Sequence, residues 1–235
     1  MKPISHSYRL LKRRWRASIG RDLHQGVQAK RPFQTLGDEK AQWSTCQDLL
    51  SEESVVYSLG VGEEISFDLQ LIKNVGLTVH GFDPTPRSIE WLSKQSLPAQ
   101  FVFHPYGVAG RDGVLQFTPP QNPRHVSHTL LKRNSPWPAI PVPVYRLSTI
   151  MKMLGHQRIE LLKMDIEGAE YEVIQDLLES RVEIHQLLVE FHHRWPEVGL
   201  DKTETAIQQL NSAGYRIFSV SPSGEEYGFL HVSQY

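Results

Sequence analysis

The segment 161–178 constrains the fold and the function of this chain more than any other. Leu161, Leu162 and Met164 predict a buried strand, which runs directly into Asp165 and Glu167. A glycine then turns the chain into a helix with an apolar stripe. Because open α/β sheets bind their ligands at the carboxyl ends of strands, this pattern predicts a site at the two acids. Acids at a helix start also favour the helix dipole, so a purely structural turn is the alternative.

The remaining sequence alternates strand and helix patterns at the spacing of a parallel sheet. Strands are predicted at residues 54–59, 77–82, 101–103, 161–164, 186–191, 215–220 and 226–232, with 114–117 as a short extension beside the third strand. Helices are predicted at 65–73, after Pro86, at 147–154, after Gly168 and at 203–212. These elements predict an α/β fold with a doubly wound, seven-stranded sheet whose last strand is antiparallel.

The chain is expected to divide into an arm and one folded domain. With 235 residues it can bury a full core. Residues 1–40 are expected to form a basic arm, partly helical or flexible, and residues 41–235 the domain. Within the domain, residues 118–143 form a proline-rich insertion. Because long irregular segments inside compact domains are usually functional or mobile, we interpret this insertion as a lid; a stiff surface connection is the alternative.

Charge and cysteine content limit the partners that this chain is expected to bind and the cellular compartment in which it is expected to work. Residues 1–31 hold nine Lys and Arg against one acid, Asp22. This segment could contact an anionic surface or RNA; a solvated terminus or an imperfect targeting peptide is the alternative. The single Cys46 excludes a disulfide framework. No apolar run approaches the roughly 18 residues that span a bilayer, and no secretory signal is recognisable. A cytoplasmic location is therefore expected, and the oligomeric state stays open.

A glycine loop and an acid indicate a nucleoside site. Gly60 and Gly62 follow the first strand, and Asp83 ends the next strand, 23 residues after Gly60. Such a turn lets a ligand lie against the backbone, and the acid can accept ribose hydroxyls. A nicotinamide dinucleotide would use the same layout, but Glu63 and Glu64 stand where its pyrophosphate would rest. Like charges about 4 Å apart repel by roughly 1–4 kcal/mol. The charge pattern therefore favours S-adenosylmethionine, which has a sulfonium and an ammonium but no phosphate.

Three segments resemble the FkbM-type S-adenosylmethionine-dependent methyltransferases, and most closely their methyltransferase-like branch. They are Ser-Leu-Gly-Val-Gly at 58–62, Phe-Asp-Pro-Thr-Pro at 82–86 and Lys-Met-Asp-Ile-Glu-Gly-Ala-Glu at 163–170, within a resemblance that covers about residues 54–233. The resemblance implies the class I methyltransferase (Rossmann-like) fold. It also implies that Gly60 and Gly62 hold the methionine part of the donor, that Asp83 binds its ribose, and that Tyr106 and Gly107 flank its adenine.

The first loop departs from the family pattern. FkbM-type enzymes commonly have Asp where this chain has Ser58, and Asn and a later Gly where it has Gly62 and Glu64. The donor's ammonium then needs another partner, for which Glu63, Glu64 and Asp165 are candidates. The expected cofactor-binding set comprises Ser58, Gly60, Gly62, Glu63, Asp83, Tyr106, Gly107 and Asp165.

The acceptor side is expected at the carboxyl ends of the fourth and fifth strands. Methyl transfer to a hydroxyl needs alignment and a base, and the candidate catalytic residues are Asp165, Glu190 and His192. His192 is the first choice as a metal-free base. Because Glu190 and His192 project to the same face, the trio could instead bind Mg or Mn. A hydrogen-bonded cluster without metal is the structural alternative.

The acceptor is expected to present an oxygen atom. A methyltransferase acting on nucleic-acid amines would carry a Pro-Pro-aromatic motif after the fourth strand, where this chain has Ile-Glu-Gly at 166–168. We therefore expect O-methylation of a small-molecule, sugar or glycan hydroxyl, with His128, Glu167 and Trp195 at the acceptor. The alternatives are a catalytically silent methyltransferase-fold binding module that acts through its basic arm, and a dinucleotide-dependent oxidoreductase.

Overall fold

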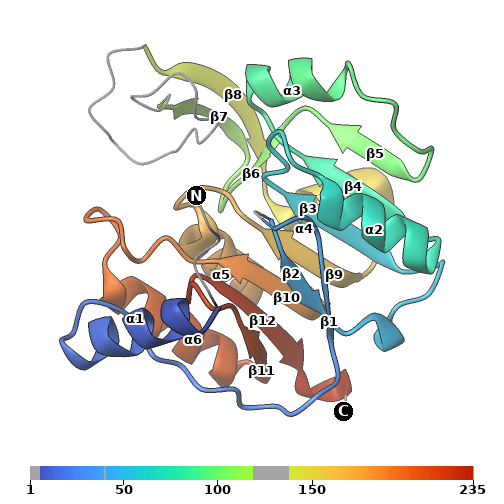
Figure 1. The fold of residues 1–235 in the computed structure, drawn as a ribbon. Coiled ribbons are helices and arrows are strands. Elements are labelled where there is room, and N and C mark those ends of the chain that lie inside the picture. The colour runs from blue at the N-terminus through green and yellow to red at the C-terminus, as the bar shows by residue number, and fades with distance from the viewer. Residues whose placement is uncertain (1–5, 40, 119–137, 235) are drawn as a thin grey trace.

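A computed structural model of the chain describes residues 6–39, 41–118 and 138–234, with side chains from residue 11 onward. Its centre is a seven-stranded sheet, whose strands are labelled in Figure 1. In spatial order the strands are β11 (Tyr215–Val220), β12 (Glu226–His231), β10 (Ile184–Glu190), β9 (Ile159–Met164), β3 (Val55–Leu59), β4 (Thr78–Phe82) and β5 (Phe101–His104). Neighbouring strands are parallel except where β12 is involved. The predicted seven-stranded sheet with an antiparallel last strand is confirmed.

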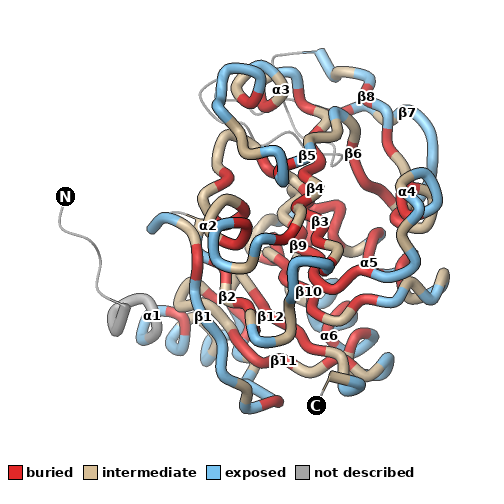
Figure 2. The backbone as a smooth tube through the Cα atoms, turned by 90° about the vertical axis from the view of Figure 1, so that its right-hand side faces the viewer, coloured by how far each residue is buried: buried red, intermediate tan, exposed pale blue. Residues whose placement is uncertain are grey.

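Helices cover both faces of this sheet. On one face, α4 (Leu147–Leu154), α5 (Glu170–Glu179) and α6 (Leu200–Ser212) pack through Ile150, Ile174 and Leu210. On the other face, α2 (Ser66–Val75) and α3 (Pro86–Leu92) pack through Leu71 and Leu92. Because both faces of the sheet are covered, β9 is buried at every position, including the charged Glu160 and Lys163 (Figure 2). Among the described helices, none combines the length and the apolar character that a membrane crossing requires.

The N-terminal segment completes the second face. After α1 (His6–Ser18), the hairpin of β1 (Gln34–Leu36) and β2 (Trp43–Thr45) places Leu36 and Trp43 in the same apolar cluster as α2. Before the hairpin, the backbone N–H groups of Gln28 and Ala29 both donate to the carbonyl of Ile217 on β11, at 2.7 and 2.9 Å. The segment before residue 40 is therefore bonded to the sheet, although the division of the chain at that residue stays a prediction.

A small third sheet corrects two expectations. It is formed by β6 (Gly107–Val108), β7 (Gly113–Phe117) and β8 (Ile140–Tyr145), in the order β6-β8-β7. The extension predicted at 114–117 beside the third strand is wrong, because β7 pairs with β8. Residues 140–143, expected to be irregular, form part of β8. Pro141 and Pro143 fit this strand because alternate residues direct their N–H groups to the same side. The lid interpretation of 118–143 falls largely on 119–137, outside the described residues.

The carboxyl ends of β3 and β9 approach so closely that a side chain does not fit between them. Gly60, directly after β3, has a φ of 74°, and a Cβ atom added there would lie 1.7 Å from the carbonyl oxygen of Asp165. The N–H of Asp165 donates to the Leu59 carbonyl at 3.1 Å, and the N–H of Gly60 donates to the Phe82 carbonyl at 2.9 Å. The ends of β3, β4 and β9 are thereby held together as one unit.

Gly60→Ala is expected to destabilise the protein by far more than the cost of placing alanine in a left-handed backbone conformation. That conformation costs a non-glycine residue roughly 1–2 kcal/mol. Gly155→Ala is the matched control, because Gly155 has a similar φ of 78° but nothing within 4 Å of an added Cβ. Urea unfolding of both variants gives the difference in the free energy of unfolding. Equal losses would mean that the contact with Asp165 does not restrict this position.

Three histidines gather on the α4 side of the sheet. His80 Nδ1 lies 3.0 Å from His104 Nε2, and the rings of His80 and His156 are 4.9 Å apart. The hydroxyl of Tyr57 lies 2.7 Å from His156 Nδ1. Burial, followed by the neighbouring histidines, lowers the pKa of His80 to about 4. Burial also lowers the pKa of His104 and His156, so the cluster is uncharged at neutral pH.

This cluster is expected to make folding stability depend on pH. A histidine whose pKa is lowered by folding binds protons more readily when unfolded, so its contribution is lost as the pH falls from the usual value of 6.5 towards about 4. The contribution of this cluster to the free energy of unfolding should therefore be less favourable at pH 5 than at pH 7. His80→Gln should reduce this difference, whereas the same change at the exposed His24 should not. Denaturant titrations at both pH values test this, and an unchanged difference in His80→Gln would contradict it.

Candidate active site

A cavity of about 340 Å³ opens at the carboxyl ends of β3, β4 and β9. This is where the strand order reverses, the place at which doubly wound sheets bind ligands. Eight of the predicted site residues line it: Gly60, Gly62, Glu63, Asp83, Gly107, Asp165, Glu167 and Glu190. Ser58 is fully buried at the end of β3, outside the lining. His128 lies outside the described residues.

Asp83 is held in a fixed orientation at the cavity wall. Its side chain is buried, and the residue is 6% exposed. Oδ2 accepts the N–H of Gly62 at 2.9 Å, and Oδ1 accepts both the N–H and the hydroxyl of Thr85, at 2.9 and 2.6 Å. Since a carboxylate oxygen can accept about two hydrogen bonds, Oδ2 retains the capacity for one more donor. Asp83 therefore connects the glycine loop to the start of α3 and still presents an acceptor.

The two acids that follow the glycine loop accept hydrogen bonds from nearby residues. Glu63 accepts two hydrogen bonds from Arg87, at 2.8 and 2.7 Å. Glu64 Oε1 accepts the N–H of Ser66 at 2.8 Å, at the start of α2, whereas its buried Oε2 has no hydrogen-bond partner among the described residues. Both side chains are thereby directed by local partners. Of the acids suggested for the donor's ammonium, Glu63 is therefore occupied by Arg87, whereas Glu64 and Asp165 line the cavity without a cationic partner as close in the described part of the chain.

Asp68 and Lys163 are cavity residues that the sequence analysis missed. Asp68, on α2, is fully buried, and neither carboxylate oxygen has a hydrogen-bond partner among the described residues. Its pKa is raised by burial, against the opposing charge of Lys163. Lys163, on β9, is 5% exposed, and its Nζ lies 5.1 Å from the ring centre of Trp43, a third lining residue. A buried carboxyl group and a lysine thus line the cavity without a close ion pair between them among the described residues.

Asp165, Glu190 and His192 come together at the ends of β9 and β10. Each offers a ligand atom, and these atoms all lie within 4.8 Å of one another. His192 Nε2 is 3.8 Å from Asp165 Oδ1 and 3.5 Å from Glu167 Oε2. The arrangement of two carboxylates and an imidazole can exchange protons with a ligand, and it has the composition of a divalent cation site.

Glu170, which the sequence analysis did not single out, holds this cluster in place. Its fully buried carboxylate accepts the N–H of Ile166 at 3.0 Å and that of Gly168 at 3.0 and 3.2 Å. The turn that it binds includes Glu167 at a φ of 56°, an uncommon conformation for a residue with a side chain. Glu170 Oε1 also lies 3.1 Å from His192 Nδ1. One carboxylate therefore positions both the turn after β9 and the histidine after β10.

These contacts set the protonation of the cluster. Burial opposes a charge on His192, but the hydrogen bond and charge of Glu170, with the charges of Asp165 and Glu167, outweigh it and raise the pKa of His192 to about 10. Burial and then the charge of Asp165 raise the pKa of Glu190 to about 9. Burial also raises the pKa of Asp165. These shifts favour the imidazolium form of His192 and the protonated form of Glu190 at neutral pH.

Two predicted aromatic residues support the site from outside its lining. The ring of Trp195 packs on that of His192, with centres 4.2 Å apart. Tyr106 packs between Phe82 and Tyr145, with ring centres 5.7 and 5.2 Å away, and its neighbour Gly107 lines the cavity.

Comparisons with known proteins show the family of this chain. The chain matches the methyltransferase FkbM domain over residues 33–217. It is 26% identical over 198 residues to the probable methyltransferase-like protein 24 of Homo sapiens, and 26% identical over 194 residues to that of Rattus norvegicus. Each alignment covers 75% of this chain and 47% of the relative, so the chain spans about half the length of these relatives.

Two solved structures are similar to this chain. Methyltransferase FkbM from Methylobacillus flagellatus KT has a TM-score of 0.48 and 14% identity, over 77% of this chain and 44% of its own. Aeropyrum pernix fibrillarin, in complex with natively bound S-adenosyl-L-methionine, has a TM-score of 0.42 and 9% identity, over 90% and 85%. Because the FkbM domain matches most of the sequence, from the β1–β2 hairpin to β11, this chain belongs to the FkbM methyltransferase family.

Proposed function

We propose that this protein is an S-adenosylmethionine-dependent methyltransferase that methylates a hydroxyl oxygen of a small molecule, sugar or glycan. The observation that carries this proposal is the buried carboxylate of Asp83, which is held by Gly62 beside a glycine-lined cavity. The cavity volume of about 340 Å³ suits a ligand of nucleoside size. Membership of the FkbM family supports methyl transfer as the reaction.

The donor would be held along the cavity by residues of three strand ends. Asp83 Oδ2 would accept a ribose hydroxyl, and Gly60 and Gly62 would leave room for the thioether. Lys163 is the cation for the donor's carboxylate, and Asp68 is the unpartnered carboxylate for its ammonium. These two residues would replace the loop acid that this chain lacks at Ser58. A nicotinamide dinucleotide remains disfavoured, because acids border the glycine loop.

Calorimetry with two ligands should distinguish the residues that bind the nucleoside part of the donor from those that bind its amino-acid part. S-adenosylhomocysteine carries the amino-acid group, and 5′-methylthioadenosine lacks it. Asp83→Ala should weaken both ligands by about 10- to 100-fold, because a hydrogen bond to a charged group contributes roughly 1.5–3 kcal/mol. Lys163→Met should weaken only S-adenosylhomocysteine. The exposed Glu90→Ala, on α3, is the control. The donor proposal fails if neither ligand binds the parent protein, or if Asp83→Ala binds both normally.

Asp165 is the group that we propose to remove the acceptor's proton. S-adenosylmethionine would supply a methyl group activated by its sulfonium, which passes to the acceptor oxygen and leaves a neutral thioether. The raised pKa of Asp165 makes it a stronger base than an ordinary aspartate. His192, predicted as the base, is already protonated in the ligand-free cluster, so we assign it the role of orienting Asp165 and Glu167. A divalent cation on Asp165, Glu190 and His192 is a second route to the same activation.

Turnover measurements distinguish a catalytic carboxylate from a mere binding site. With a panel of hydroxylated small molecules and sugars, Asp165→Asn should lower kcat by roughly 10²–10⁴-fold, the usual contribution of a general base. The affinity for S-adenosylhomocysteine should change far less. If EDTA leaves kcat unchanged, the carboxylate acts without metal; if EDTA abolishes turnover and Mn or Mg restores it, the cation route holds. Full turnover by Asp165→Asn would exclude both routes.

A further inference from the structure

From residue 11 onward, helix α1 exposes its large apolar side chains to solvent and buries an arginine against the protein. Leu11, Trp15 and Ile19 are 66%, 62% and 45% exposed. Because they are spaced four residues apart, they lie along one stripe, which continues just past the helix end. Arg13 lies on the opposite side of the helix and is only 7% exposed. A surface helix of a globular protein normally has the reverse arrangement, so this helix is built to present its apolar stripe outward.

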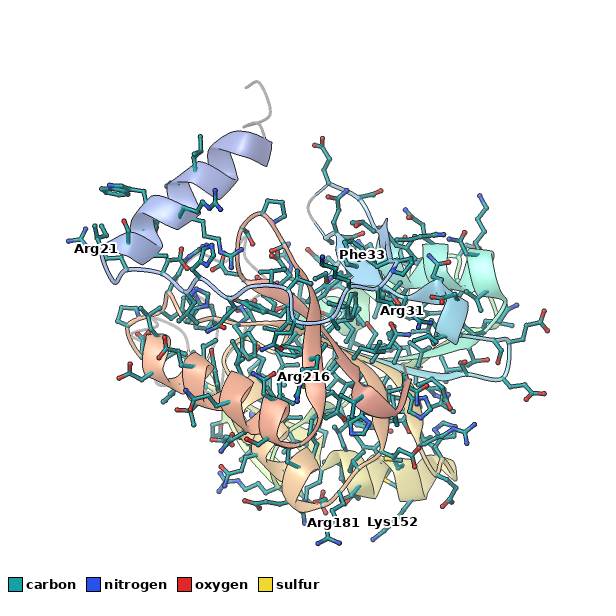
Figure 3. All side chains as sticks on the ribbon, turned by 90° about the horizontal axis from the view of Figure 1, so that it is seen from below. Arg21, Arg31, Phe33, Lys152, Arg181 and Arg216 are labelled. Carbon is teal, nitrogen blue, oxygen red and sulfur yellow. The ribbon has the colours of Figure 1, made fainter. Side chains whose placement is uncertain are left out.

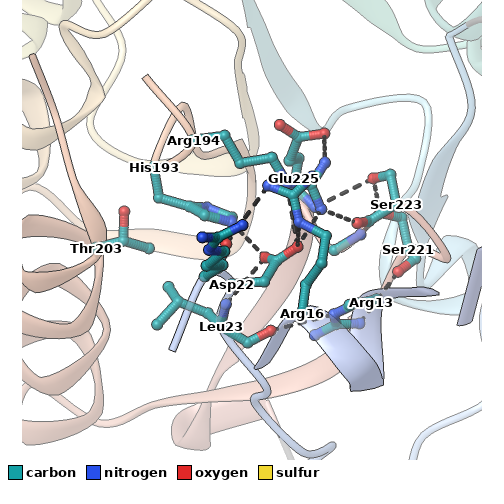
Figure 4. A network of polar contacts seen from close by, with 12 residues as sticks. Arg13, Arg16, Asp22, Leu23, His193, Arg194, Thr203, Ser221, Ser223 and Glu225 are labelled. Carbon is teal, nitrogen blue, oxygen red and sulfur yellow. Dashed lines mark hydrogen bonds and ion pairs between the residues drawn. The ribbon is translucent and has the colours of Figure 1, made fainter. Parts of the chain in front are cut away.

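Polar contacts fix the helix in this orientation. Arg13 Nε donates to the carbonyl of Leu23 at 3.3 Å, and its Nη1 donates to that of Ser221 at 3.4 Å. Just after the helix, the fully buried side chain of Asp22 lies 2.9 Å from His193 Nε2 and accepts a hydrogen bond from Arg194 at 2.8 Å (Figure 4). Rotating the stripe inward would break these contacts and bury charged groups without partners.

Cations border the exposed stripe on both sides. Successive helical residues are rotated by about 100°, which follows from 3.6 residues per turn, so the exposed Lys12 and Arg14 flank Leu11 and Trp15. Arg21 follows at the base of the helix, where Figure 3 shows it far from Lys152 and Arg181. Asp22, the single acid within residues 1–31, is buried and pairs with His193 and Arg194. The outward surface of α1 is therefore apolar at its centre and positive at its edges.

We propose that α1 docks this protein on an anionic membrane surface. Leu11, Trp15 and Ile19 would enter the boundary between headgroups and acyl chains, and Lys12 and Arg14 would contact the headgroups. A basic amphipathic helix with Trp and Leu on its apolar side is the pattern of helices that lie in this interface. RNA fits this surface less well, because phosphates attract the cations but offer no apolar phase for leucine and isoleucine. The docked helix would stay attached to the fold through Arg13 and Asp22.

Vesicle sedimentation with the full chain tests this proposal. We expect binding to vesicles of phosphatidylcholine with phosphatidylserine, weaker binding to phosphatidylcholine alone, and a decline with added salt. Each basic residue near an anionic surface contributes roughly fivefold in affinity. Lys12→Glu with Arg14→Glu should therefore weaken binding at least tenfold. Leu11→Asp with Trp15→Asp should abolish it by removing the inserted side chains.

Matched controls keep the result specific to α1. Lys152→Glu with Arg181→Glu makes the same charge change at the far end of the molecule, and Val114→Asp with Met153→Asp replaces side chains that are 65% and 54% exposed elsewhere. Both controls should bind vesicles like the parent. Thermal melting and S-adenosylhomocysteine affinity should be equal in all variants, since α1 does not line the cavity. Absent vesicle binding, equal losses in the controls, or binding of single-stranded RNA in place of vesicles would overturn the proposal.

Discussion

The contact between the backbones of Gly60 and Asp165 is the constraint on which the site depends. Because no side chain separates the ends of β3 and β9, the glycine loop can bend back over the sheet, and the N–H of Gly62 reaches Asp83 on the next strand. The same approach places the carboxylate of Asp165 at the cavity rather than in the sheet. The loop that would hold a donor and the acid that would act on an acceptor are thus positioned by one contact.

The electrostatics of the cavity favour a cationic ligand. Acids dominate its lining, whereas Lys163 is the single Lys or Arg among the described residues that form it. Burial raises the pKa of Asp68, Asp165 and Glu190, so these groups hold protons more strongly than exposed carboxylates do. A ligand with a sulfonium and an ammonium would replace those protons. Donor binding and ionisation of the proposed base are then linked, because each positive charge favours the carboxylate form.

Sequence patterns predicted the sheet and the ends of its strands, because both follow from the spacing of apolar residues over short stretches of the chain. Gly60, Asp83 and Asp165 were found this way, and the parallel order brings them together. The sequence indicated Asp68 less clearly than these three residues, because its only distinguishing feature is an acid on the inward face of a predicted helix. Lys163 lies two residues before Asp165 and so shares its face. No sequence pattern pointed to Trp43, because it lies on the β1–β2 hairpin, which is far from β9 in sequence but packs beside the cavity. The protonation of His192 depends on Glu170, a contact between separate elements that no local pattern contains.

The pair His192 and His193 links the proposed site to the proposed docking helix. Adjacent residues after a strand project to opposite sides, and here His192 faces Glu170 while His193 faces Asp22. The arm that carries α1 therefore contacts, through Asp22, the same short loop that contributes His192 to the site. Arg194 strengthens this connection, since it pairs with both Asp22 and Glu225. A protein docked through α1 would hold its cavity near the membrane, because Arg13 and Asp22 attach the helix and the residues after it to the fold.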